Sequence, residues 1–264
     1  MHLVDVHTHL DHPQFEKDLL DVIKRAKAAG IVAVITQGVD HERNLALLEL
    51  AKLDPMIKVA FGMYPLDALN VEVDPELAAG DDYSRRTKTS FADTLDAIEE
   101  HKDAIIAIGE VGMDFKYSKD HETQSANFRQ IVRLAKRIHK PLIVHSRNAE
   151  KEILDILEDE QYFHVDMHCF SGSRKLLERG IKLGLMFSIP TNVVRNQQFQ
   201  QAVEALPIGN ILTETDAPYL GPYKDLRNEP ANIKEAILKI AELKRMDPVE
   251  VANAIYFNYQ KMFL

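Results

Sequence analysis

Short runs of apolar residues, each followed by polar or turn-forming residues, recur along the whole chain and are typical of buried β-strands. Longer stretches with apolar residues three and four positions apart alternate with them and predict amphipathic helices. The expected strands are residues 3–6, 32–36, 58–62, 105–109, 142–145, 164–168, 183–188 and 211–215. Helical spacing is clear in residues 19–26, 45–51, 128–135, 153–157 and 233–240, and Pro248–Phe263 is expected to form a last helix.

Strand and helix alternate as βα units, which indicates a parallel sheet covered by helices. Eight such units within 264 residues favour closure into a (β/α)8 TIM barrel. We therefore expect one α/β domain over residues 1–264. The alternation of strands and helices is interrupted at residues 71–90, which we expect to form a long loop after the third strand.

Composition narrows the setting in which this barrel works. Apolar residues make up 45% of the chain and charged residues 28%, which is typical of a folded globular protein. The sequence lacks an apolar run of about 20 residues and the features of a signal peptide. The single cysteine, Cys169, excludes an internal disulfide, so a cytoplasmic location is expected. A net charge of −9 argues against tight non-specific binding of duplex nucleic acid, but not against a cleft that handles a strand end.

Imidazole and carboxylate side chains occur at the carboxyl ends of five expected strands. His7 and His9 lie two positions apart at the end of the first strand, so their side chains point to the same face. The carboxyl ends of barrel strands form the reactive face, so we expect these groups to converge there. Each group also has an interpretation without metal. His7 and His9 can be a pair of loop histidines, Asp216 can cap a helix, and Glu110 can be a buried carboxylate paired with a base. The whole set is His7, His9, Glu110, His145, His168 and Asp216.

The size of this set predicts two divalent cations. Catalytic zinc usually takes three protein ligands and a water, so six ligands exceed what one ion needs. Glu110 has two oxygens and is the natural bridging ligand, while Asp216 can both bind metal and accept a proton from water. Histidine with carboxylate suits zinc and manganese and, less comfortably, magnesium.

Other polar residues near these strand ends have two interpretations each. Arg147 leaves the fifth strand on the same side as His145, where its guanidinium can contact a phosphate or form a structural ion pair. Arg227, with Glu229 close by, has the same two interpretations. Asp114 follows the fourth strand and either caps the next turn or takes part in catalysis.

These residues lie in segments that resemble the TatD family of metal-dependent hydrolases, within the amidohydrolase-like barrels. The resemblance extends over essentially the whole chain in the right order. It implies a barrel with two cations and phosphodiester hydrolysis, commonly described as deoxyribonuclease activity, and it places metal ligands at the six residues named above. The matching segments are His7-Thr8-His9-Leu10, Gly109-Glu110-Val111-Gly112-Met113-Asp114-Phe115, Pro141-Leu142-Ile143-Val144-His145-Ser146-Arg147, His168-Cys169-Phe170-Ser171-Gly172, Glu214-Thr215-Asp216-Ala217-Pro218-Tyr219-Leu220 and Arg227-Asn228-Glu229-Pro230.

One segment departs from the family pattern. The family usually carries Gly-x-His-Pro after the third strand, and this chain has Tyr64 at the histidine position, between Gly62 and Pro65. A tyrosine hydroxyl can donate a hydrogen bond to a phosphate oxygen, but it does not shuttle protons at pH 7. The departure leaves the expected metal site intact but counts against an efficient nuclease reaction.

The leading hypothesis is a two-metal phosphodiesterase or deoxyribonuclease that acts as an exonuclease on single-stranded or frayed DNA ends. Barrels exchange substrates through their loops, so hydrolysis of an aminoacyl-tRNA ester, an amide or a lactone is the nearest alternative. A metal-binding assembly protein without useful turnover is an alternative of another class. A PHP-type phosphoesterase also begins with a His-x-His segment, but Glu110 and Asp216 fit the eight-unit barrel better.

Overall fold

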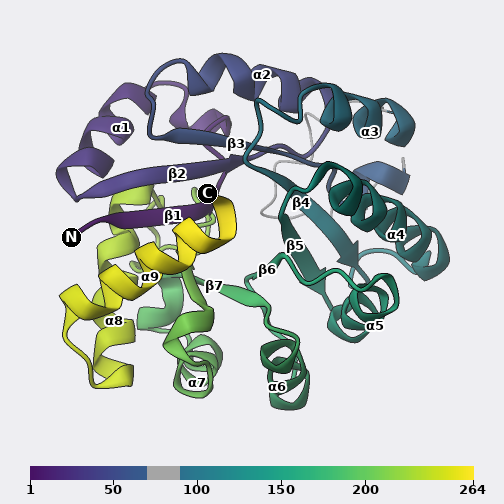
Figure 1. The fold of residues 1–264 in the computed structure, drawn as a ribbon. Helices are drawn as coiled ribbons and strands as arrows, with labels where there is room; N and C mark the ends of the chain where they lie inside the picture. Colours follow the sequence, from purple (N-terminus) through teal and green to yellow (C-terminus); the bar gives the residue numbers. More distant parts are fainter. Residues whose placement is uncertain (70–89) are drawn as a thin grey trace.

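Eight parallel strands pair in chain order and close into a barrel, as Figure 1 shows. The computed structural model describes residues 1–69 and 90–264. Closure joins β1 to β8: Thr8 pairs with Ala217 in parallel, and the Thr213 hydroxyl donates to the Val4 carbonyl at 2.8 Å. The predicted (β/α)8 barrel is thus confirmed. The strands are β1 (Leu3–Thr8), β2 (Ile31–Gln37), β3 (Ile57–Phe61), β4 (Ala107–Asp114), β5 (Leu142–Arg147), β6 (Val165–His168), β7 (Met186–Pro190) and β8 (Ile211–Glu214).

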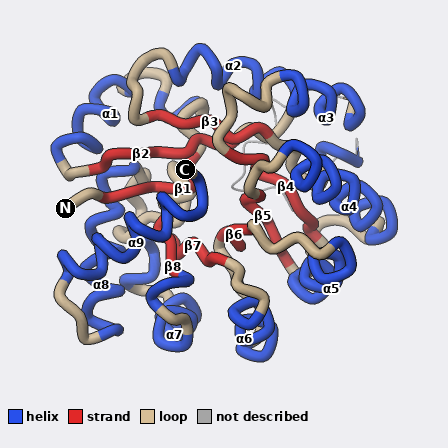
Figure 2. Tube along the Cα trace, in the orientation of Figure 1, coloured by secondary structure: helices blue, strands red, loops and turns tan. Residues whose placement is uncertain are grey.

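Helices form an outer ring around the strands, visible in blue around red in Figure 2. Their apolar faces lie on the barrel, and polar caps define several of their starts; Asp40, for example, accepts a hydrogen bond from the Arg43 amide at 2.8 Å. The helices are α1 (Leu19–Ala28), α2 (His41–Ala51), α3 (Phe91–Glu100), α4 (His121–Ile138), α5 (Glu150–Glu160), α6 (Arg174–Lys182), α7 (Gln197–Ala205), α8 (Ile233–Lys244) and α9 (Pro248–Phe263). Short 3-10 helices lie in the connections: η1 (Pro13–Phe15), η2 (Asp67–Leu69), η4 (Thr191–Val194), η5 (Ile208–Asn210) and η6 (Pro230–Asn232).

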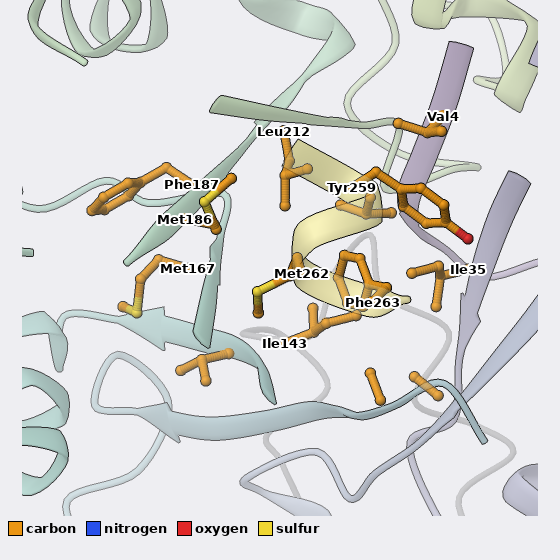
Figure 3. Packing of buried hydrophobic residues seen from close by; sticks show 14 of the residues in the cluster. Val4, Ile35, Ile143, Met167, Met186, Phe187, Leu212, Tyr259, Met262 and Phe263 are labelled. Atoms are coloured by element: carbon orange, nitrogen blue, oxygen red, sulfur yellow. The ribbon is translucent and has the colours of Figure 1, made fainter. Parts of the chain in front are cut away.

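Helix α9 closes the amino-terminal end of the barrel. The Asn258 amide donates to the carbonyl of Ile211, the first residue of β8, at 2.8 Å, and His164 Nε2 donates to the Met262 carbonyl at 2.7 Å just before β6. Figure 3 shows Met262 and Phe263 among apolar side chains of the strands. Burying each such side chain contributes about 1.5–3 kcal/mol. With this end filled, the carboxyl ends of the strands are left as the face for chemistry.

All eight expected strands are present, but their bounds differ from the prediction, most of all in β4 and β7. Strand β4 runs on to Asp114 because its pairing with β5 continues to Arg147, although polar residues interrupt its apolar pattern. Strand β7 starts at Met186 because Gly184 takes a positive φ of 79° just after α6. The expected loop 71–90 lies outside the described residues except for Ser90, which caps α3. Among the helices of residues 1–69 and 90–264, none has the length and apolar character to cross a bilayer.

Candidate metal centre

Four donor atoms from three strand regions meet at the carboxyl end of the barrel. His7 lies in β1, His9 follows it, Glu110 lies in β4 and Asp216 follows β8. His7 Nε2 is 3.4 Å from Glu110 Oε2 and 3.6 Å from Asp216 Oδ1, and His9 Nε2 is 3.6 Å and 3.4 Å from the same two oxygens. Ligand atoms about 2.1 Å from a tetrahedral ion would lie about 3.4 Å apart. The spacing therefore suits four ligands of one cation.

The other oxygen of Glu110 faces a second group. Glu110 Oε1 is 2.8 Å from His145 Nδ1, and one donor atom each of Glu110, His145 and His168 lies within 4.8 Å of the others. His145 comes from β5 and His168 ends β6. Glu110 Oε2 thus faces His7 and His9, and Oε1 faces His145. His168 lies near both groups, because it also offers a donor atom within 4.8 Å of those of His7 and Asp216. The structure brings together all six side chains that the sequence singled out.

Charge within the cluster is set by burial and by close pairing. Burial by itself raises the pKa of Glu110, but the hydrogen bond from His145 and the close approach of the His7 imidazole lower it well below its usual value. The pKa of Asp216 is also lowered, because His9 and the charges of His168 and His7 outweigh burial. Both side chains are therefore carboxylates at pH 7 and can act as anionic ligands.

The His7 ring supplies a test of whether a cation fits. The ring is fully buried, and neither of its nitrogens has a hydrogen-bond partner in the described part of the chain. A buried polar atom without a partner is costly, and native structures rarely leave one unexplained. Burial, and then the charge of His168, lowers the pKa of His7, so its imidazole is the neutral form that binds metal. A divalent cation at Nε2 fits this donor set.

Asp114 lies behind His145. Its Oδ2 is 3.3 Å from His145 Nε2 and accepts a 2.8 Å hydrogen bond from the Tyr64 hydroxyl, while its Oδ1 accepts from the Lys116 and Tyr117 amides at 2.9 and 3.2 Å. Asp114 therefore caps the turn after β4 and also holds a histidine of the cluster. The Tyr64 hydroxyl thus contacts Asp114, which in turn contacts His145.

Glu214 has the corresponding place behind His168, and sequence reasoning missed it. Its Oε2 lies 2.6 Å from His168 Nδ1 and accepts a 2.6 Å hydrogen bond from the Ser188 hydroxyl. Its Oε1 accepts from the Cys169 amide at 3.1 Å and thiol at 2.7 Å. The signal was available: Glu214 is an ionisable residue at the end of a short strand expected to be buried, two positions before Asp216.

The backbone around the cluster is locally strained. Cys169 and Asp216 take positive φ values of 46° and 52°, which bulky side chains rarely adopt. Such conformations persist where the surrounding structure over-determines them and concentrate at functional sites. Cys169 directly follows the end of β6, and Asp216 lies two positions beyond the end of β8.

The two arginines singled out by the sequence lie in different places. Arg147 ends β5 beside the cluster, with Nε 3.7 Å from Asp114 Oδ2, its guanidinium 5.3 Å from the centre of the Tyr117 ring and 37% of its side chain exposed. The Arg227 guanidinium instead pairs with Asp18 through two 2.7 Å hydrogen bonds and lies 4.6 Å from the centre of the Phe15 ring. Arg147 thus lies at the cluster, whereas Arg227 joins the connection after β8 to the start of α1.

Comparisons with known proteins agree with this architecture. A family model described as TatD related DNase matches residues 4–264. Deoxyribonuclease TATDN3 of Homo sapiens is 34% identical over 267 residues, covering 99% of this chain and 94% of that protein. The uncharacterized metal-dependent hydrolase YabD of Bacillus subtilis is 31% identical over 268 residues, covering 99% and 98%. The crystal structure of YjjV, a TatD homologue from Escherichia coli K12, has a TM-score of 0.85 and 25% identity, covering 99% and 97%. The chain belongs to the TatD family of metal-dependent hydrolases.

Proposed function

We propose that this protein is a two-cation phosphodiesterase that hydrolyses DNA from single-stranded or frayed ends. The observation that carries the proposal is the placement of Glu110, whose two oxygens face separate sets of imidazoles. A shared carboxylate between two donor groups is the arrangement expected of a two-metal hydrolase. Relatives named as deoxyribonucleases support DNA as the substrate.

Each cation has its own ligands in this proposal. The first would be held by His7, His9, Asp216 and one oxygen of Glu110, and the second by His145, His168 and the other oxygen of Glu110. When bound, such a pair of cations supplies charge stabilisation at phosphoryl oxygens and acidifies water. Zinc and manganese suit this mixture of imidazole and carboxylate, and magnesium suits it less well.

Asp216 is the group that takes up a proton in this proposal. Its lowered pKa keeps the carboxylate charged at pH 7, and its backbone is fixed by a 2.8 Å hydrogen bond from the Asp216 amide to the His7 carbonyl. A charged carboxylate in the cluster can accept a proton from an attacking water as the water oxygen bonds to phosphorus. The bond from phosphorus to the leaving sugar oxygen breaks in the same step, and that oxygen takes a proton from solvent. Glu110 serves as a ligand and stays anionic throughout.

Arg147 is the proposed contact to the DNA backbone. It lies beside the cluster with more than a third of its side chain exposed, and the ring of Tyr117 contacts both its guanidinium and the Lys116 ammonium. A guanidinium matches phosphate oxygens in geometry, and a nearby aromatic ring can stack on a base. Because the chain carries a net charge of −9, such local groups suit one strand end better than a broad duplex surface.

The proposal is tested with end-labelled DNA in single-stranded, blunt duplex and frayed forms. Zn²⁺, Mn²⁺ and Mg²⁺ are each added to chelator-treated protein, and products are followed with and without EDTA. We expect EDTA-sensitive shortening from the ends, lost in Glu110→Ala and Asp216→Asn. Glu99→Gln is the matched control and should retain activity. It changes an exposed carboxylate on α3 that pairs with Arg137 of α4.

A substrate panel separates this reaction from its nearest alternative. An aminoacyl-tRNA ester, an amide and a lactone are tested under the same metal conditions. Turnover of one of these substrates with no cleavage of any DNA form would overturn the proposal while keeping the metal chemistry. Cation binding without turnover on the whole panel would favour an assembly protein instead.

A further inference from the structure

The histidines of the two donor groups differ in what holds their second nitrogen. In His145 and His168, one ring nitrogen faces a buried carboxylate outside the cluster. In His7, the second nitrogen is buried without a hydrogen-bond partner in the described residues. The two sets of ligands therefore do not have equal support.

At His145 the support comes from Asp114. The Nδ1 atom faces Glu110 Oε1 at 2.8 Å, and the Nε2 atom faces Asp114 Oδ2 at 3.3 Å. Asp114 is fully buried and is held on both oxygens by Tyr64 and by backbone amides. Its backbone is also fixed, because Gln124 exchanges two hydrogen bonds with it at 2.7 and 3.0 Å. With Nε2 turned to Asp114, Nδ1 is the nitrogen that faces the cluster and can ligate.

At His168 the support comes from Glu214, and the two ring nitrogens have the opposite roles to those in His145. The Nδ1 atom is engaged by Glu214 Oε2 at 2.6 Å, so Nε2 is the nitrogen left for the cluster. Glu214 is fully buried and held by the Ser188 hydroxyl and by the Cys169 amide and thiol. The two neighbouring histidines are therefore set to bind through different ring nitrogens.

We propose that Asp114 and Glu214 are positioning residues for one of the two cation positions, fixing His145 to ligate through Nδ1 and His168 through Nε2. A carboxylate that accepts the second N–H of a ligating histidine fixes its tautomer and ring orientation and strengthens it as a ligand. The cation position of His7 and His9 does not depend on this pair. The inference rests on the two-cation site of the proposed function, but concerns metal binding and not the substrate.

Metal titration of the full chain tests the selectivity. Chelator-treated protein is titrated with Zn²⁺ by calorimetry, and the wild type is expected to bind two equivalents. Asp114→Ala and Glu214→Ala should each weaken one equivalent about 10–100-fold and leave the other unchanged. Asp114→Asn and Glu214→Gln keep an oxygen that can accept the imidazole N–H, so they should weaken it less than the alanine variants.

Asp54→Asn is the matched control. Asp54 is also a buried carboxylate, but it lies just before β3 at the amino-terminal end of the barrel, where it accepts a hydrogen bond from the Met56 amide and pairs with Lys27. Both equivalents should bind this variant as they bind the wild type. Equal weakening of both equivalents in the Asp114 and Glu214 variants, or no weakening of either, would overturn the inference.

Nitrogen-15 NMR of the zinc-loaded wild type provides a readout that needs no variant. We expect the remaining ring proton on Nε2 of His145 and on Nδ1 of His168. Finding the proton on the same nitrogen in both rings would contradict the positioning role. Two bound cations with these tautomers but no DNA cleavage would leave this inference standing and remove the proposed function, and DNA cleavage with the wrong tautomers would do the reverse.

Discussion

His7 and His168 stack face to face, with ring centroids 3.6 Å apart and planes at 12°. One ring comes from β1 and the other from β6, so the contact spans the inside of the barrel. Two protonated imidazoles at this distance would repel strongly. The contact accordingly combines a lowered pKa at His7 with a raised pKa at His168.

Cation binding should release a proton from His168. Burial alone lowers the pKa of this imidazole, but the charge of Glu214 and its hydrogen bond raise it to about 10. Below pH 10 the metal-free ring is thus protonated, and the Nε2 proton must leave before that nitrogen can bind metal. We expect His168 to contribute about one proton per chain to the release, and this proton alone makes the apparent affinity rise roughly tenfold per pH unit below pH 10. Calorimetry at pH 7 in buffers of different ionisation enthalpy measures the release, and an unchanged release in His168→Ala would contradict the assignment.

Removal of metal should lower the thermal stability. Glu110 and Asp216 place two carboxylates in one buried cluster, and their mutual repulsion is relieved by a cation between them. A ligand at 100 times its Kd stabilises the folded state by about 2.7 kcal/mol. For a chain of this size that corresponds to a rise in Tm of about 5–10 °C. Differential scanning calorimetry with Zn²⁺ and with EDTA gives the shift.

Glu110→Gln is the control for that measurement. It keeps the size of the side chain but removes the charge that both donor groups share. The difference in Tm between the zinc and EDTA samples should shrink to a few degrees, about that of one weakly held ion. A full shift in this variant would show that the stabilising cation binds elsewhere.

The strand ends could be predicted from the sequence because the barrel imposes one simple rule on them. Parallel strands bring their carboxyl ends to one face, so an apolar run followed by a histidine or carboxylate places that group at the site. His145, His168 and Asp216 follow this rule directly. Their convergence needed no knowledge of side-chain contacts.

The rings that the supporting carboxylates hold could not be predicted in the same way. Glu214 ends β8, and its partners Ser188 and Cys169 come from β7 and from just beyond β6. Which rings they hold depends on side-chain direction and on the distance between strands, which periodicity does not encode. The end of β4 was missed for a related reason, because Glu110 interrupts the apolar pattern while the backbone pairing continues.

Arg147→Ala should weaken the use of DNA without affecting metal binding. The guanidinium is partly exposed and stands beside the cluster at Asp114. Loss of a charged hydrogen bond of about 1.5–3 kcal/mol predicts a fall in kcat/KM of about 10–100-fold. Arg147→Lys keeps the charge but loses the forked geometry, so it should fall between the wild type and the alanine variant. Steady-state kinetics on a labelled oligonucleotide measures both variants, and unchanged kinetics in both would remove Arg147 from the DNA contact.

Arg227→Ala separates the two interpretations of the second arginine. Its ion pair with Asp18 and its contact with Phe15 predict a loss of folding stability of about 1 kcal/mol with kcat/KM close to that of the wild type. A substrate contact predicts the reverse, with a raised KM and little change in stability. Urea denaturation and steady-state kinetics on the same preparation decide between them.

The ion pairs between α4 and α5 should make stability depend on acid pH. Glu160 binds Arg133 and Arg129 through hydrogen bonds of 2.8–3.1 Å, and these contacts lower its pKa from 4.5 to about 2. A lowered pKa in the folded state contributes stability above pH 4.5 that is lost as the pH falls towards 2. Glu160→Gln should therefore reduce the free energy of unfolding by about 1 kcal/mol at pH 7, since the pair lies at the surface.

The difference between Glu160→Gln and the wild type should shrink below pH 4.5 and approach zero near pH 2. Urea denaturation from pH 7 down to the lowest pH at which the protein stays folded follows it. In a chain that already carries Arg129→Gln and Arg133→Gln, Glu160→Gln should show no such trend, because its carboxylate has lost both partners. A difference that stays constant with pH would mean that Glu160 acts through packing and not through its charge, because only a charge effect is linked to the protonation of its carboxylate.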